Sequence, residues 1–110
     1  MELEGRLTKR SLKRILTETE YYNLKNLDTL EQLAKATKIF SGKESNYKCT
    51  SSAWNVRFGF KDITIDLNSS DDTFSVRPES STSQAMRWEK FEGRVKSSSG
   101  FVVSSAIIHN

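Results

Sequence analysis

The chain has 110 residues, a net charge of +3, and a composition of 35% hydrophobic and 28% charged residues, which excludes a disordered tail and predicts one globular domain over residues 1–110. No apolar stretch approaches the roughly 20 residues that cross a bilayer, so we expect a soluble, cytoplasmic protein with no membrane partner. Cys49 is the only cysteine, which excludes an internal disulfide and any multi-cysteine metal site.

The first predicted element is an amphipathic helix that begins near residue 6 and continues to about residue 22. At 100° per residue, its larger apolar side chains share one arc with small polar ones. The opposite arc carries five cations with no acid among them: Arg6, Lys9, Arg10, Lys13 and Arg14. Residues 1–48 hold ten Lys and Arg against seven Asp and Glu, whereas residues 49–110 hold seven of each. The sequence therefore places its excess positive charge on the N-terminal helix.

A second helix is predicted from Asp28 to about residue 40. Asp28 and Glu31 have the spacing of an acidic capping box, and apolar residues then recur at helical intervals. Ser41 and Gly42 are typical of a helix end. Residues 6–40 are thus expected to be helical.

From Ser45 onward the hydrophobic pattern changes to a period of two, which predicts a mainly β region over residues 45–108. Apolar residues alternate with polar ones over residues 56–60, 63–67 and 73–77, and the segment 101–108 is apolar on both faces. Residues 83–92 favour a short helix that Ser83 would cap, although Met86 and Trp88 also suit a strand, so both assignments stay open. The predicted class is α+β, with two N-terminal helices packed on a mainly antiparallel sheet of four to five strands.

Part of this β region resembles a known nucleic-acid-binding pattern. The stretch SAWNVRFGF followed by DDTFSV is similar to the cold-shock domain, in which aromatic side chains on strands stack on unpaired bases. The resemblance implies that Arg57 and Lys61 contact the phosphate backbone. It implies four stacking platforms: Trp54, Phe58, Phe60 and Phe74. The same alternation is also typical of a strand that buries one face in a core, and the spacing favours this packing role.

No residues form a complete catalytic, cofactor-binding or metal-binding motif. The only imidazole is His109, and Asp62 and Asp66 would stand roughly 13 Å apart along one strand. The five glycines are scattered singly, so there is no glycine-rich phosphate loop. We therefore expect a non-catalytic protein that uses no cofactor and no metal.

The basic helix gives the leading functional hypothesis, a binding protein that engages nucleic acid or a nucleoprotein. Its predicted binding residues are Arg6, Lys9, Arg10, Lys13, Arg14, Arg57 and Lys61. The alternative is a protein-interaction, regulatory or inhibitor module with an acidic protein as its partner. That module would act through the sheet or through exposed aromatics such as Tyr21, Trp54 and Trp88.

Overall fold

A computed structural model of the chain describes residues 2–3, 9–68, 70–98 and 101–109. Its helices are α1 (Lys9–Ile15), α2 (Glu18–Leu24), α3 (Thr29–Trp54) and α4 (Ser81–Gln84), with a 3-10 turn at Trp88–Lys90. Its strands are β1 (Glu2–Leu3), β2 (Ile63–Asn68), β3 (Thr73–Pro78), β4 (Phe91–Ser98) and β5 (Phe101–Ile108). The predicted α+β class, with N-terminal helices packed against an antiparallel sheet, is confirmed.

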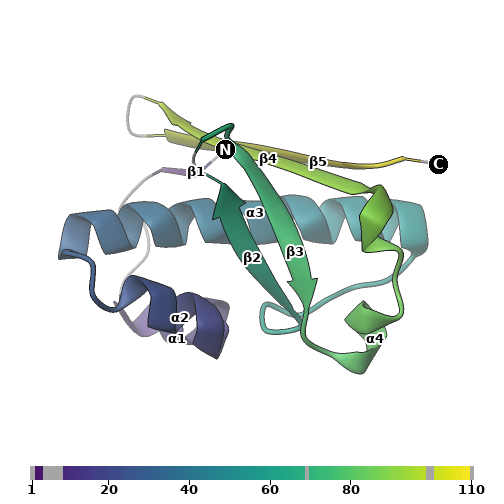
Figure 1. Ribbon diagram of the computed structural model, residues 1–110, viewed down its shortest axis with the longest axis horizontal. Coiled ribbons are helices and arrows are strands. Elements are labelled where there is room, and N and C mark those ends of the chain that lie inside the picture. Colours follow the sequence, from purple (N-terminus) through teal and green to yellow (C-terminus); the bar gives the residue numbers. More distant parts are fainter. Residues whose placement is uncertain (1, 4–8, 69, 99–100, 110) are drawn as a thin grey trace.

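The sheet has the order β1-β5-β4-β3-β2, and all its neighbouring strands are antiparallel. β4 pairs with β5 along its whole length, from Phe91↔Ile108 to Ser98↔Phe101. The register of β3 with β4 covers only Thr73↔Arg94 and Phe74↔Gly93. Because that junction is short, the β2–β3 hairpin turns away from β4 and β5 and crosses α3 (Figure 1).

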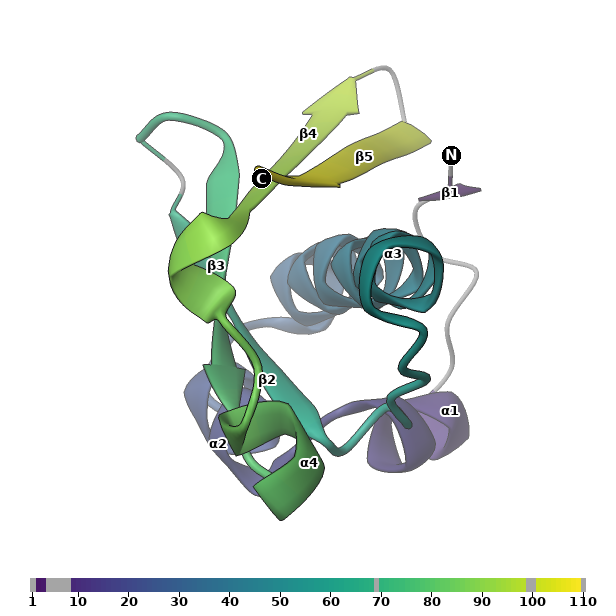
Figure 2. The ribbon, with the colours of Figure 1, turned by 90° about the vertical axis from the view of Figure 1, so that its right-hand side faces the viewer.

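Helix α3 is the centre of the molecule. In Figure 2 it lies between the β4–β5 ribbon above and the two N-terminal helices below, with α1 at the lower right and α2 at the lower left. The core brings residues of these elements together, and its buried apolar members are Leu12, Ile15, Leu16, Leu24, Ala36, Ile39, Phe58, Ile63, Ile65, Phe74, Val95 and Val102. The long helix therefore joins the two parts of the sheet to the N-terminal helices.

Two glycines lie at the sheet junction, and close packing there depends on one of them. The buried ring of Phe74 lies against both Gly42 of α3 and Gly93 of β4. A Cβ atom at Gly93 would lie 2.4 Å from that ring, whereas one at Gly42 would make an ordinary contact at 3.6 Å. Gly93 thus leaves the space that the Phe74 ring fills.

The single helix predicted over residues 6–22 is wrong, because Thr17 divides it. Thr17 has an extended backbone and caps α2: its hydroxyl accepts from the Glu20 N–H at 3.3 Å, and its own N–H donates to Glu20 Oε1 at 2.7 Å. This capping box starts a new helix after Ile15. Residue 6, where the predicted helix begins, lies outside the described residues.

The predicted helix end at Ser41 and Gly42 is also wrong, since α3 continues to Trp54. Both residues are buried, and the Ser41 hydroxyl lies 2.6 Å from the Ser104 hydroxyl of β5. Burial of this face offsets the roughly 1 kcal/mol that a glycine costs inside a helix. The helix ends instead at Asn55, whose left-handed backbone (φ 54°) lets its N–H bond the Thr50 carbonyl.

The β region consequently begins later than residue 45. Residues 45–54 are helical and residues 55–62 form a loop, so the strand predicted at 56–60 is wrong. The strands predicted at 63–67, 73–77 and 101–108 are confirmed. The helix expected at 83–92 is reduced to α4 and the Trp88–Lys90 turn, because β4 already begins at Phe91.

Candidate functional site

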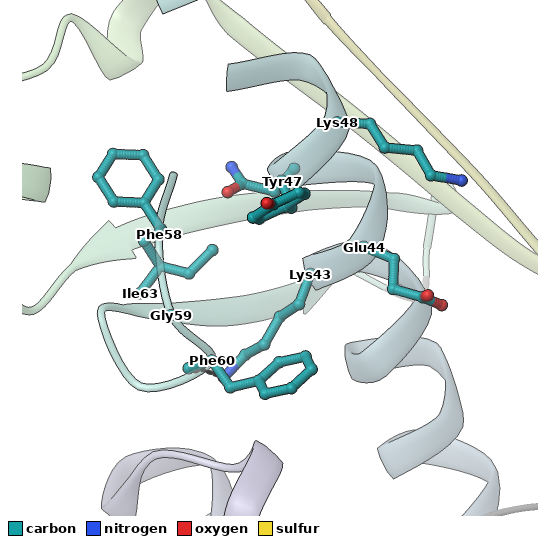
Figure 3. A pocket seen from close by; sticks show the side chains of 9 residues that line it. Lys43, Glu44, Tyr47, Lys48, Phe58, Gly59, Phe60 and Ile63 are labelled. Atoms are coloured by element: carbon teal, nitrogen blue, oxygen red, sulfur yellow. Dashed lines mark hydrogen bonds between the residues drawn. The ribbon is translucent and has the colours of Figure 1, made fainter. Parts of the chain in front are cut away.

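A pocket of about 420 Å³ lies between the second half of α3 and the loop 55–62 (Figure 3). Its described lining residues are Lys43, Glu44, Asn46, Tyr47, Lys48, Phe58, Gly59, Phe60 and Ile63. All of them come from one continuous stretch of chain, residues 43–63. The long helix and the loop that follows it therefore build the pocket together.

The polar edge of the pocket comes from α3. Glu44 and Lys48 are four residues apart, so they stand one helical turn apart on the same side of α3 (Figure 3). Lys48 is exposed, and Glu44 is partly buried. Both residues line the pocket, and in Figure 3 both side chains extend from α3 away from the loop that carries Phe58 and Phe60.

Aromatic side chains form the apolar wall. Phe58 is buried, and its ring centroid lies 5.6 Å from that of Trp88. Tyr47 and Phe60 stand at the rim with 43% and 42% of their surface exposed. The base of the wall is therefore closely packed, whereas the two exposed rings at its opening have room to rotate.

Lys43 holds the loop in place from below. Its ammonium group donates to the Ile15 carbonyl at 2.7 Å, to Glu20 Oε1 at 2.7 Å, and to the Phe60 carbonyl of the loop. Burial lowers the pKa of Lys43, and the Glu20 carboxylate opposes that shift. All three ammonium hydrogens are used inside the protein, so Lys43 positions the pocket wall and is not available to a ligand.

Glu20 completes this buried network. Its Oε1 also accepts from the Thr17 N–H, and its Oε2 accepts from the Ile65 N–H of β2 at 2.6 Å. The Lys43 and Glu20 side chains are only 2% and 1% exposed. One ion pair therefore connects α2, α3, β2 and the pocket loop, which the sequence analysis did not anticipate.

The other end of the loop is fixed by Asp62. Its Oδ2 accepts from the Gly59 N–H at 2.7 Å, and its carbonyl accepts from the Ser83 hydroxyl at 2.9 Å. The same carbonyl accepts from the N–H groups of Glu79 and Ser80. The aspartate that the sequence analysis placed on a strand face instead holds the pocket loop in shape.

The polar edge suits a ligand that carries phosphate. Lys48 can neutralise a phosphate, and Glu44 can supply one oxygen ligand to Mg²⁺, which is commonly bound by one or two carboxylates together with substrate phosphates and water. Within the described ranges, no three His, Cys, Asp or Glu side chains are grouped to hold a metal. The residues present therefore fit a metal that is held jointly with the substrate.

The predicted nucleic-acid-binding residues lie mainly elsewhere. Lys13 and Arg14 are exposed on α1, and Lys9 and Arg10 belong to the same helix, while Arg6 lies outside the described residues. Arg57 and Lys61 are exposed on the pocket loop, not on a strand. Lys13 of α1 and Lys61 of the loop, which are far apart in the sequence, line one groove of about 570 Å³ together with Glu18, Tyr21, Tyr22 and Lys25.

The stacking platforms implied by the cold-shock resemblance do not form one surface. Phe58 and Phe74 are buried in the core, and Trp54 packs edge-on against Trp88 with ring centroids 5.0 Å apart. Phe60 alone of the four is half-exposed, at the pocket rim. The packing role that the spacing favoured is therefore correct for Phe58 and wrong for Phe60, and the platform role is wrong for the buried Phe58 and Phe74.

Taken together, these elements form a small α+β domain whose pocket has an aromatic wall and the charged residues Glu44 and Lys48 in its lining. The model of the 4'-phosphopantetheinyl transferase superfamily matches residues 2–103, and the chain belongs to that family. None of the curated proteins compared with the chain matches it. In the part of the chain that the structure describes, no helix has the length and apolar character needed to span a membrane.

Family membership corrects the functional predictions. The expectation of a non-catalytic protein is wrong, because the family is one of transferases. The same finding overturns the hypothesis of a nucleic-acid-binding protein and its alternative, a regulatory or interaction module. Sequence reasoning missed Glu44 and Lys48 because it ended the helix before them, although their spacing of four residues would have placed them together on a continued helix.

Proposed function

We propose that the protein transfers a 4'-phosphopantetheinyl group from a phosphoanhydride donor, such as coenzyme A, to a hydroxyl group of an acceptor protein. The observation that carries the proposal is the family match over residues 2–103. The pocket supports it, because an apolar wall with a charged edge suits a donor that is part organic chain and part phosphate.

In the proposed reaction the acceptor hydroxyl oxygen attacks the phosphorus that bears the pantetheine chain. A new P–O bond forms, the phosphoanhydride P–O bond breaks, and the nucleotide phosphate leaves while the hydroxyl proton passes to solvent or to the leaving phosphate. Enzymes promote such transfers mainly by positioning the groups and stabilising the charge on the phosphate oxygens. The protein therefore needs charged groups at the pocket edge more than it needs a nucleophile of its own.

Glu44 and Lys48 take these roles in the proposal. Glu44 would hold Mg²⁺, which supplies positive charge to the phosphates when it is bound. The Lys48 ammonium would bind a phosphate oxygen directly, and charge-assisted hydrogen bonds of this kind contribute about 1.5–3 kcal/mol. Lys43 would act through the loop, by holding the Phe60 carbonyl and with it the apolar wall.

The acceptor that we propose is an acidic protein in the cytoplasm. Lys13 and Arg14 are exposed on α1, and the nearby groove adds Lys25 and Lys61, which outnumber the one acid among its described lining residues, Glu18. A surface of this sign steers a negatively charged partner toward the pocket side of the molecule and accelerates association at low salt. The KM for the acceptor should therefore rise with salt, and Lys13→Glu should raise it further.

The test is transfer of label from fluorescent coenzyme A, in the presence of Mg²⁺, to an acidic carrier protein stripped of its phosphopantetheine group. Glu44→Gln should lower the rate at least about 100-fold, since metal binding contributes several kcal/mol of transition-state stabilisation. Lys48→Met should raise the KM for the donor about tenfold or more. The matched controls are Glu31→Gln and Lys35→Met, which change exposed residues of α3 outside the pocket. No labelling by the wild-type protein, where a known transferase labels the same acceptor, would refute the proposal.

A further inference from the structure

One residue of the pocket has a side chain with no hydrogen-bond partner. Asn46 is 1% exposed, and within the described structure neither its amide nitrogen nor its amide oxygen is hydrogen-bonded. Buried amide groups in proteins are nearly always satisfied, because an unpaired buried donor or acceptor is destabilising. Such a group inside a pocket wall needs a specific explanation.

Asn46 lies there because of its place on α3. Lys43, Asn46 and Thr50 follow the i, i+3, i+7 spacing of the buried face, and the Asn46 carbonyl accepts from the Thr50 hydroxyl at 2.9 Å. Asparagine is a weaker helix former than leucine or methionine, which would also fill a buried position without an unpaired polar group. Neither helix formation nor core packing accounts for an asparagine at this position.

We propose that Asn46 is a ligand-binding residue that recognises an amide group of the pantetheine chain, an inference that rests on the proposed function. The side-chain amide offers one acceptor and two donor hydrogens, so it can pair with the N–H and the C=O of a secondary amide at the same time. Phosphopantetheine carries two secondary amides along a chain that is otherwise mostly aliphatic, apart from one hydroxyl group and the terminal thiol. The pocket presents the matching arrangement, one amide among the apolar side chains of Tyr47, Phe58 and Ile63.

Access to Asn46 requires a small movement of the pocket rim. Its amide atoms are closed off from solvent, although the residue lines the pocket. Tyr47 and Phe60 stand at the opening and are only about half covered, so their rings have room to rotate, and we expect this rotation to expose the amide. Shielding from water also makes the new hydrogen bonds more selective, since a ligand without an amide leaves Asn46 unpaired.

The test compares two probes, coenzyme A and adenosine 3',5'-bisphosphate, which lacks the pantetheine chain. Asn46→Leu should raise the Kd for coenzyme A about tenfold, the effect of losing one to two neutral hydrogen bonds, and leave the Kd for the bisphosphate within about twofold. Calorimetry gives both constants. In the wild-type protein, the side-chain amide NMR signal of Asn46 should shift with coenzyme A and not with the bisphosphate.

Ser51→Ala is the matched control. The Ser51 hydroxyl is also buried without a partner in the described structure, but Ser51 is not among the described pocket-lining residues. This variant should leave both dissociation constants unchanged. Asn46→Leu should in addition be at least as stable as the wild type in urea, so a binding loss would not reflect unfolding.

The outcomes separate this inference from the proposed function. If the wild type binds coenzyme A and Asn46→Leu binds it equally well, the role of Asn46 is refuted while the proposed function stands. Equal weakening of both probes would show that Asn46 supports the site in general, and it would also refute amide recognition. If the wild type binds neither probe, the proposed function fails and the inference falls with it.

Discussion

Replacing Glu20 by glutamine tests whether the buried ion pair with Lys43 stabilises the fold and the pocket loop. The variant keeps the shape of the side chain but removes the charge that faces the Lys43 ammonium at 2.7 Å. It also replaces one of the two acceptor oxygens by an amide NH2 group. The Thr17 N–H, which bonds Oε1, or the Ile65 N–H, which bonds Oε2, therefore loses its acceptor. This nearly isosteric change should therefore remove both the ion pair with Lys43 and one hydrogen bond to a backbone N–H.

The expected magnitude follows from the burial of the pair. Removing one partner of a buried ion pair leaves an uncompensated charge and costs about 3–5 kcal/mol. Small domains have a total unfolding free energy of about 5–15 kcal/mol, so Glu20→Gln should lose a large part of it. Urea unfolding followed by fluorescence of Trp54 and Trp88, which pack together beside the pocket wall, measures the change.

The matched control is the exposed pair of Asp66 and Arg77. Its two hydrogen bonds are each 3.0 Å long, but both side chains are more than a third exposed. Exposed pairs of this kind contribute at most about 1 kcal/mol, so Asp66→Asn should change stability little. If Glu20→Gln lost no more stability than Asp66→Asn, the buried pair would not stabilise the contacts among α2, α3, β2 and the pocket loop.

Two further predictions concern packing and pH. Gly93→Ala should lower the unfolding free energy by about 1–3 kcal/mol, because its Cβ would lie 2.4 Å from the Phe74 ring. Gly42→Ala, whose Cβ would make an ordinary contact, should be neutral or stabilising by up to about 1 kcal/mol. Thermal unfolding of both variants checks this, and equal losses of stability would contradict it. Burial lowers the pKa of Lys43 in the folded protein below its ordinary 10.5. At a pH between the folded-state pKa and 10.5 the unfolded chain binds more protons than the folded protein, so the free energy of unfolding rises with pH. Without the Glu20 charge the pKa of Lys43 falls further, so the stability that Glu20→Gln loses relative to wild type should become smaller as the pH rises toward 10.5. Urea titrations measure this, and a loss that grows with pH would contradict the linkage.

Local signals in the sequence identified much of the fold. The Asp28 cap was predicted from its spacing to Glu31, and its side chain does accept from the Glu31 N–H at 2.9 Å. The alternation of residues 63–67 and 73–77 predicted the hairpin, because a half-buried strand has a period of two. Signals of this kind depend on near neighbours along the chain, so they can be read without the tertiary structure.

The pocket could not be predicted in the same way. Gly42 would end an isolated helix, but in the fold it packs on the Phe74 ring and α3 continues. That single error left Glu44 outside the predicted helix, assigned Lys48 to the β region, and hid their common helical side. The pairing of Lys43 with Glu20 across 23 positions depends on how α2 meets α3, which no local pattern encodes.

The continuity of the pocket-lining segment has an evolutionary consequence. Because the described lining residues all fall within positions 43–63, a change of ligand preference requires substitutions in one short part of the gene and none in the β4–β5 ribbon. The loop inside that segment can also lengthen at small cost, since each doubling of a flexible loop costs only about 0.6 kcal/mol of closure entropy. Chains that share this architecture but differ in donor should therefore diverge most between the helix end at Trp54 and the start of β2.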